Sequence, residues 1–263
     1  MATPARLVDF IKTQSSLREF IKNVKYFVVD EADQILNTNM KPDLEYISSS
    51  LPKEKQTLFF SATVHNADIP PHYFNKTPIE IDAYQDPVKV VKTLTQKYML
   101  VPEYITDCTL VYLLTHLADS KMCIVFAQKC LQVQIISQML RHFNLSSSIL
   151  HSLMPQKKRT ANLYNFRSQL TKILICTDLA SRGLDIPSVD LVINIECPKN
   201  PDYYVHRVGR TARALKNGYS ITFVNQHSEE KLKRVEEYIG VKLGIVVMRG
   251  NEDKRGEDTW PIK

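Results

Sequence analysis

Short apolar segments alternate with helical segments along the second half of the chain. The apolar segments show no polar alternation, which is typical of strands buried on both faces of a parallel sheet. Strands are predicted at 122–126, 147–150, 172–176, 191–195 and 220–224, and helices at 130–143, 156–166, 201–207 and 229–239. Helices between such strands cover both faces of the sheet. The pattern therefore predicts an α/β fold, with one complete domain over residues 87–240.

The first part of the chain contains fewer elements of the same kind. Strands are predicted at 26–30, 57–60 and 79–82. Asp86-Pro87 predicts a turn, after which residues 96–101 are strand-like and residues 107–117 helical. We expect residues 1–86 to form an incomplete α/β domain whose earlier strands lie outside this sequence. We assign residues 241–263 to a charged tail, and we expect its end, residues 249–263, to be disordered or frayed because it is charged and rich in turn formers.

The composition narrows the class of protein. The sequence contains no run of about 18 apolar residues and no signal-peptide core, so we expect an intracellular protein that does not enter a membrane. The net charge of +6 fits a polyanionic partner but is weak evidence for one. No CxxC pair occurs, and we expect structural thiols at the five cysteines, Cys108, Cys123, Cys130, Cys176 and Cys197.

Glycine usage bears on phosphate binding. The chain has seven glycines, and the first is Gly183. A phosphate-binding loop needs glycines because its backbone N–H groups must approach the phosphates closely. No GxxxxGK[ST] sequence occurs among the later glycines either. These 263 residues are therefore predicted to contain no such loop.

The tetrapeptide DEAD, residues 30–33, ends the predicted strand 26–30. Carboxylates at the carboxyl end of a parallel strand face the ligand crevice of an α/β sheet. One of them could hold a hydrated Mg²⁺ ion, and the next could orient or deprotonate an attacking water. The alternative is a solvated helix start, where acidic residues are favoured. The tripeptide SAT, residues 61–63, follows the next strand, and its hydroxyls could hydrogen-bond the carboxylates.

Two basic segments suit phosphate groups. In HRVGRTAR, residues 206–213, three arginines recur at a spacing of three and would share one face of a helix. Such a cluster suits a phosphate that bears developing charge, and the alternative is a solvated basic face. The second segment, QKKR, residues 156–159, lies at a predicted helix start, where N–H groups favour anions. An ordinary solvated helix face is again the alternative.

Taken together, these segments resemble the motifs of the DEAD-box RNA helicases, in the order and spacing of that family. DEAD and SAT resemble motifs II and III. The other similar segments are TPAR at 3–6, where the family usually has TPGR, IVFAQK at 124–129, QKKR at 156–159, TDLASRGLDIP at 177–187 and HRVGRTAR at 206–213. The sequences that flank the motifs are similar to those of the nucleolar family members that act in small ribosomal subunit assembly.

The resemblance implies a role for each matching residue. It implies catalysis by Asp30, Glu31, Arg210 and Arg213, with Asp30 holding Mg²⁺ through water, and motif coupling by Asp33, Ser61, Thr63, His206 and Arg207. It implies nucleotide contacts at Gly183 and Asp185, and RNA backbone contacts at Thr3, Arg6, Gln156, Arg159 and Thr177.

The resemblance also implies a fold and an activity. The fold would be two RecA-like units, the first incomplete, because the family's phosphate-binding loop lies upstream of the TPGR element. The activity would be ATP-dependent remodelling of RNA duplexes or RNA–protein complexes, with ATP and Mg²⁺, in rRNA processing. The partners would be RNA and pre-ribosomal proteins, and the protein would be a monomer in the nucleolus. The alternatives are a catalytically inactive RNA-binding or partner-docking module, and a remodeller of DNA.

Overall fold

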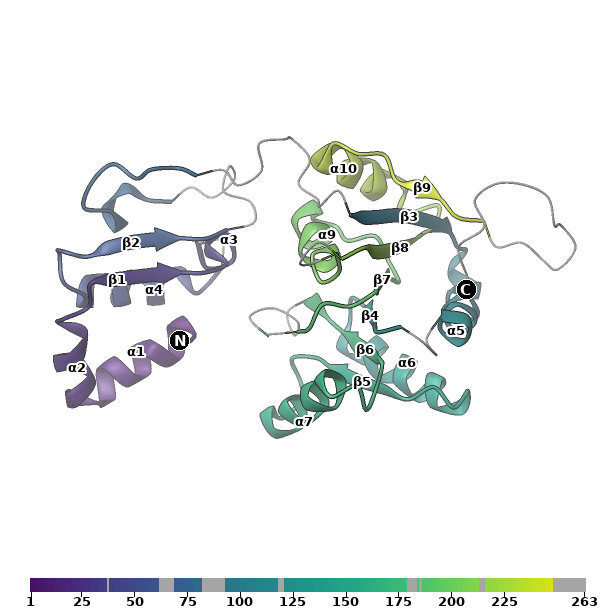
Figure 1. Ribbon diagram of the computed structural model, residues 1–263, viewed down its shortest axis with the longest axis horizontal. Coiled ribbons are helices and arrows are strands. Elements are labelled where there is room, and N and C mark those ends of the chain that lie inside the picture. Colours follow the sequence, from purple (N-terminus) through teal and green to yellow (C-terminus); the bar gives the residue numbers. More distant parts are fainter. Residues whose placement is uncertain are drawn as a thin grey trace, which may run out of the picture. The chain divides into compact units, whose positions relative to one another are not determined.

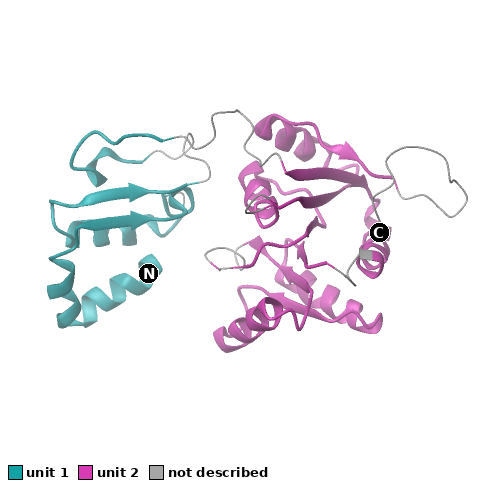
Figure 2. Cartoon of the chain, in the orientation of Figure 1, with its two compact units in different colours: residues 1–83 teal, residues 84–263 magenta. Residues whose placement is uncertain are grey.

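The computed structural model describes residues 1–36, 38–61, 69–81, 93–117, 121–178, 184, 186–212 and 216–247. The chain divides into two compact units, residues 1–83 and residues 84–263 (Figure 2). We call them unit 1 and unit 2 and describe each by itself. Within the described ranges, no helix combines the length and the apolarity that crossing a membrane requires.

Unit 1 is built on a pair of parallel strands (Figure 1). β1 (Tyr26–Val29) pairs with β2 (Gln56–Phe59), with Val29 opposite Phe59. The helices of the unit are α1 (Pro4–Thr13), α2 (Ser15–Ile21), α3 (Ala32–Leu36), α4 (Lys41–Ser50) and the 3₁₀ helix η2 (Pro71–Tyr73). Burial of apolar side chains between these elements is the main force that holds them together. One cluster consists of Val29, Ala32, Leu36, Leu44 and Tyr73, and another of Val8, Ile11, Ile21 and Ile47.

The third strand predicted for this unit, at 79–82, is wrong for the residues that the structure describes. Residues 79–81 form no strand, and Ile79 and Ile81 are 89% and 82% exposed. A β-prone sequence forms a strand only beside a partner strand, because the ladder hydrogen bonds and the cross-strand contacts supply its stability. Asp82 lies outside the described residues.

Unit 2 contains a seven-stranded parallel sheet with the order β5-β6-β4-β7-β8-β3-β9 among its described residues. The strands are β3 (Leu94–Leu100), β4 (Cys123–Phe126), β5 (Ser147–Leu150), β6 (Ile173–Cys176), β7 (Leu191–Asn194), β8 (Gly218–Val224) and β9 (Gly244–Ile245). The helices are η3 (Glu103–Ile105), α5 (Thr106–Leu117), α6 (Cys130–His142), α7 (Gln156–Arg167), α9 (Pro201–Val208) and α10 (Glu229–Ile239). The predicted parallel α/β fold is confirmed.

Both faces of this sheet are buried, as the absence of polar alternation predicted. Along β4, Cys123 and Val125 pack with α5 and α6, whereas Ile124 and Phe126 pack in a separate cluster with Phe166 of α7. Successive side chains of a strand point to opposite faces, so an apolar strand of this kind needs a helical layer on each side. A third cluster joins α9 and α10 around Tyr204, Val208, Leu232, Val235 and Ile239.

The segment assigned to a charged tail begins with residues 241–247, which pack on unit 2, whereas residues 249–263, expected to be frayed, lie outside the described residues. Gly240 ends α10 in the left-handed conformation, with φ 69°, and the chain turns back toward the sheet. Leu243 and Val246 are buried, and the Leu243 N–H donates to the Glu236 carboxylate at 2.9 Å. β9 then adds to the edge beside β3. Contacts with α10 and β3 order this segment, and its local composition carried no sign of them. Residues 248–263 lie outside the described part of the chain.

Candidate active site

The DEAD segment lies at the carboxyl end of β1, beside the SAT segment. The Phe60 N–H donates to the Val29 carbonyl at 2.8 Å, and the Ala32 N–H donates to the Phe60 carbonyl at 2.9 Å. These backbone bonds continue the β1–β2 pairing past the ends of both strands. They hold residue 31 next to residue 60, and therefore next to Ser61. The structure thus brings the two motifs together at one edge of unit 1.

Backbone strain marks the turn between β1 and α3. Glu31 has φ 50°, a left-handed conformation that is uncommon for residues other than glycine. Its N–H donates to the carboxylate of Asp30 at 2.9 Å. Such conformations persist only where the surroundings hold them in place, and they are concentrated at functional sites. The turn leaves the Asp30 side chain exposed to solvent and buries Asp33 in the first turn of α3.

The residues at this turn fit a hydrated Mg²⁺ ion. In the described part of the chain, no three His, Cys, Asp or Glu side chains are grouped so as to hold a metal ion. Mg²⁺ does not need such a cage, because it retains several waters and binds through one or two carboxylates together with substrate phosphates. Asp30 is an exposed carboxylate at the carboxyl end of a parallel strand, which suits this mode. Its role stays a prediction.

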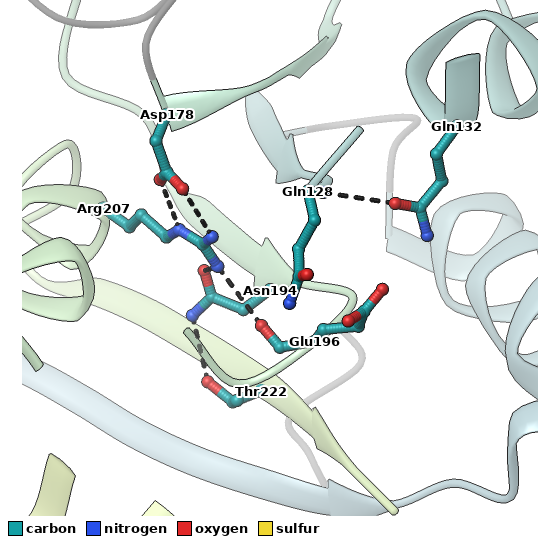
Figure 3. Close-up of polar contacts among 7 residues, drawn as sticks. All are labelled: Gln128, Gln132, Asp178, Asn194, Glu196, Arg207 and Thr222. Carbon is teal, nitrogen blue, oxygen red and sulfur yellow. Dashed lines mark hydrogen bonds and ion pairs between the residues drawn. The ribbon is translucent and has the colours of Figure 1, made fainter. Parts of the chain in front are cut away.

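In unit 2, Arg207 is a buried cation whose guanidinium donates four hydrogen bonds (Figure 3). Its side chain is 2% exposed, and its Nε and Nη2 donate to the two carboxylate oxygens of Asp178 at 2.6 and 2.8 Å. Its Nη1 donates at 3.2 Å to the Asn194 side chain and at 3.2 Å to the Glu196 carbonyl. A buried charge is tolerated only with such partners. Its guanidinium also lies over the Phe126 ring at 5.3 Å.

This network joins the carboxyl ends of two strands to α9. Asp178 follows β6, Asn194 ends β7, and Arg207 comes from the last turn of α9. α9 begins at the Asn200 side chain, which accepts a hydrogen bond from the Asp202 N–H, and Pro201 takes the first helical position. The start of the helix thus sets the place of Arg207 about two turns later. The predicted coupling role of Arg207 fits this geometry.

Arg207 and Arg210 of HRVGRTAR do not share a helix face, contrary to prediction, and Arg213 lies outside the described residues. α9 ends at Val208, and Arg210 lies in the turn that follows. Gly209 and Ala212 interrupt the helix, and Ala212 has φ 56°. Arg210 is 8% exposed, and its Nη1 donates to the Leu184 carbonyl at 3.4 Å. The turn sends Arg210 toward the TDLASRGLDIP segment, away from the partners of Arg207. His206 is half-buried on α9.

The predicted RNA contacts of unit 2 lie at the carboxyl ends of β5 and β6. Gln156 is exposed in the first turn of α7, and Arg159 is half-buried there. Burial and the nearby guanidinium of Arg159 lower the pKa of His151, which directly follows β5. Thr177 directly follows β6, and its N–H donates to the Leu150 carbonyl at 3.2 Å. The Thr177 hydroxyl is buried without a hydrogen-bond partner among the described atoms.

In unit 1, Thr3 and Arg6 lie at the start of α1. Thr3 precedes the helix without capping it through its side chain. The Arg6 guanidinium lies over the Phe10 ring at 4.5 Å and is 3.8 Å from the Asp9 carboxylate. Four predicted site residues, Thr63, Gly183, Asp185 and Arg213, lie outside the described residues.

The sequence analysis missed Asp178 and Asn194. A signal for Asp178 was present, since it is a carboxylate just beyond a buried strand, as Asp30 is at the end of β1. Asn194 had a weaker signal, a lone amide at the end of an apolar strand. It is fully buried, and its amide also donates to the Thr222 hydroxyl at 3.0 Å.

Two parallel α/β units, with acidic and hydroxyl motifs at the edge of one sheet and a buried arginine network at the edge of the other, define the RecA-like helicase class. Comparisons with known families agree. Residues 1–69 match the family model of the DEAD/DEAH box helicases, and residues 105–215 match the helicase conserved C-terminal domain. The chain belongs to the DEAD-box helicase family.

Individual relatives are similar over most of the chain. Probable ATP-dependent RNA helicase DDX49 of Homo sapiens is 42% identical over 92% of the chain and 51% of its own length. ATP-dependent RNA helicase dbp8 of Schizosaccharomyces pombe is 39% identical over 92% of the chain and 56% of its length. The chain thus spans about half the length of these relatives.

Solved structures support the RecA-like fold. S. cerevisiae Dbp5 bound to RNA and ADP BeF3 superposes with a TM-score of 0.78 at 26% identity. The match covers 92% of the chain and 64% of the Dbp5 chain.

Proposed function

We propose that this chain supplies the RNA- and ATP-handling motifs of an ATP-dependent RNA helicase that remodels RNA duplexes or RNA–protein complexes. The observation that carries the proposal is the Arg207 network. It ties the HRVGRTAR segment to Asp178, just after β6, through two hydrogen bonds, and to Asn194 and Glu196 through two more. An ordinary solvated basic face would expose its arginines, whereas Arg207 and Arg210 are both buried.

ATP is the proposed substrate, and unit 1 carries its acidic machinery. Asp30, exposed at the end of β1, would hold Mg²⁺ through water, and Glu31 would orient or deprotonate the attacking water. When bound, the metal ion would neutralise charge on the phosphates. Asp33 and Ser61 would couple this turn to the RNA-binding surface. From unit 2, Arg210 would stabilise charge that develops on the γ-phosphate.

Arg213 would assist Arg210 at the phosphate. Gly183 and Asp185 would contact the nucleotide, with Asp185 on the ribose. Thr63 would act with Ser61, and His206 would act with Arg207. These five assignments rest on the resemblance of the surrounding motifs to those of the family.

RNA would be bound through its backbone. Gln156, Arg159 and Thr177 of unit 2, and Thr3 and Arg6 of unit 1, are the proposed contacts. The buried Thr177 hydroxyl, with no acceptor among the described atoms, supports a phosphate contact there. Backbone contacts carry no sequence information, so binding should be sequence-independent and should weaken as salt rises.

We further propose that the protein acts in rRNA processing and ribosome biogenesis, as a monomer in the nucleolus that works together with pre-ribosomal proteins. The support is the resemblance of the segments around the motifs to the nucleolar members of the family.

A second candidate function is a catalytically inactive module that binds RNA or docks a partner. The absence of a GxxxxGK[ST] sequence from these 263 residues favours it for the chain acting alone. The two candidates differ in a single measurable property, namely whether hydrolysis occurs once a phosphate-binding loop is supplied.

Fusing the chain behind an N-terminal DEAD-box segment that carries the phosphate-binding loop tests the proposal. Arg210→Ala should then lower RNA-stimulated ATP turnover by roughly 10³-fold or more, the range for arginine fingers in phosphoryl transfer. Arg234→Ala is the matched control, because Arg234 is 67% exposed on α10 and should leave turnover unchanged. Thermal melts check folding. A fused protein whose Arg210→Ala variant keeps near-normal turnover would refute the arginine-finger assignment.

A further inference from the structure

One stretch of unit 2 accounts for the net positive charge of the whole chain. Eight of the 34 Lys and Arg residues, and none of the 28 acidic residues, lie between Asp119 and Asp178. The eight are Lys121, Lys129, Arg141, Lys157, Lys158, Arg159, Arg167 and Lys172. Because the net charge is +6, the remainder of the chain is slightly acidic. The excess lies in the part of unit 2 that contains β4, α6, β5, α7 and β6.

α7 presents this charge on one exposed face. Lys157, Lys158 and Arg167 are exposed, and Tyr164 is 65% exposed. Lys157 and Tyr164 are seven residues apart, about two turns, so they lie on the same side of the helix. The opposite side packs on the sheet through Phe166, which is fully buried. α7 packs against β5, the last strand at its end of the sheet (Figure 1). The face that bears Tyr164 therefore points away from the sheet.

α10 of the same unit has an ordinary solvated face, which differs in charge from the exposed face of α7. Its exposed face carries three glutamates and two Lys or Arg residues, and Arg234 is 3.9 Å from Glu230 one turn away. Mixed signs of this kind are typical of a face whose only neighbour is water. α7 has four Lys or Arg residues and no acidic residue, and an exposed aromatic ring lies among them. This combination suits a ligand with both phosphates and stacking bases.

We propose that the exposed face of α7 is a second contact surface for single-stranded RNA, beyond the contacts at the start of the helix. A base would stack on Tyr164, and Lys157 and Arg167 would contact the flanking phosphates. The inference rests on the proposed function, in which the RNA backbone is bound at Gln156 and Arg159. Tyr164 lies eight residues beyond Gln156, about 12 Å along the helix axis at 1.5 Å per residue. Only an RNA that extends past the first site can reach it.

Binding of the full chain to fluorescent uridine homopolymers of increasing length tests the inference. For the wild-type protein, affinity should rise again once the RNA is long enough to pass Tyr164. Tyr164→Ala should remove that second rise in affinity. It should weaken the binding of long RNA about tenfold, the scale of one base–aromatic stack, and leave the binding of short RNA unchanged. Arg167→Gln should lower the salt slope for long RNA by about 0.7, the share of one phosphate contact. Ultraviolet crosslinking, mapped by mass spectrometry, should identify Tyr164.

Two matched controls separate a local effect from a general one. Tyr104→Ala removes a tyrosine that is 87% exposed outside the basic stretch, and Arg234→Gln removes an exposed charge on α10. Neither should change the affinity or the salt slope. The inference is overturned if Tyr164→Ala binds long RNA like the wild type. It is also overturned if polyglutamate competes as well as RNA for this face, because an acidic protein segment would then be the occupant.

A different result would refute the proposed RNA contacts at Gln156 and Arg159. In that case Gln156→Ala with Arg159→Ala would leave the binding of short RNA unchanged. A third outcome is that those substitutions weaken the binding of short RNA while the α7 substitutions leave the binding of long RNA unchanged. The first site would then be supported and the α7 surface would be refuted.

Discussion

Removing the carboxylate of Asp178 should destabilise unit 2 far more than removing an exposed acid. Arg207 would keep its hydrogen bonds to Asn194 and Glu196 but lose the two to Asp178. A buried ion left without its partner costs about 3–5 kcal/mol. The Asp178 side chain is 19% exposed, so water can partly solvate the site, and we expect Asp178→Ala to cost about 3 kcal/mol.

Hydrogen exchange of the β7 and α9 amides measures this cost locally, without assuming that the two units unfold together. A loss of about 3 kcal/mol corresponds to roughly 150-fold faster exchange of amides that exchange only through unfolding of the unit. Glu230→Ala is the control, because its pair with Arg234 is exposed and is worth about 0.5 kcal/mol or less. Asp178→Asn keeps a hydrogen-bond acceptor, so its loss of stability should lie between those of Asp178→Ala and Glu230→Ala. A loss below about 1 kcal/mol for Asp178→Ala would refute the argument that this pair holds α9 against the sheet.

Three further outcomes are expected. The 263-residue chain alone should release no phosphate from ATP, even with RNA, and turnover of about 1 s⁻¹ that Asp30→Ala abolishes would contradict this. The hydrogen bond to Ser152 lowers the pKa of Cys130, whereas burial raises the pKa of Cys123. At pH 7 iodoacetamide should therefore modify Cys130 before Cys123, and Ser152→Ala should slow the modification of Cys130. Equal rates for the two thiols would refute the assignment. A Cβ at Gly218 would collide with the backbone that follows α9, so Gly218→Ala should lower the free energy of unfolding by about 1–3 kcal/mol. Urea unfolding measures this loss, and an unchanged midpoint would count against the argument.

Strain and exposure at the DEAD turn could not be predicted from the sequence. The position of Asp30 at the end of a buried strand was predictable, because apolar runs of four or five residues flanked by polar ones are local signals. The left-handed conformation of Glu31 was not, since it depends on the backbone bond between Ala32 and Phe60, residues in different segments. The predicted position of the motif was therefore correct, and its geometry came from the pairing of β1 with β2.

The arginines of HRVGRTAR give the clearest contrast. Their spacing of three predicted one helical face, and helical periodicity is a sound local argument. The helix ends at Val208, however, so Arg207 and Arg210 enter different surroundings. No local feature of the segment reveals that Asp178, 29 residues earlier, is the partner of Arg207. That partner is brought near by the sheet order, which places β6 and β7 on either side of β4.

The sequence by itself determined the alternation of strands and helices, the burial of both sheet faces and the position of the DEAD and SAT segments just after strands. These properties follow from the hydrophobicity of neighbouring residues, which is local information. Only the tertiary structure decided the strand order, the ordering of residues 241–247 against α10 and β3, and the partners of Arg207. Those features join segments far apart in the chain. Their free energy comes from burial and hydrogen bonds that exist only once the segments have met.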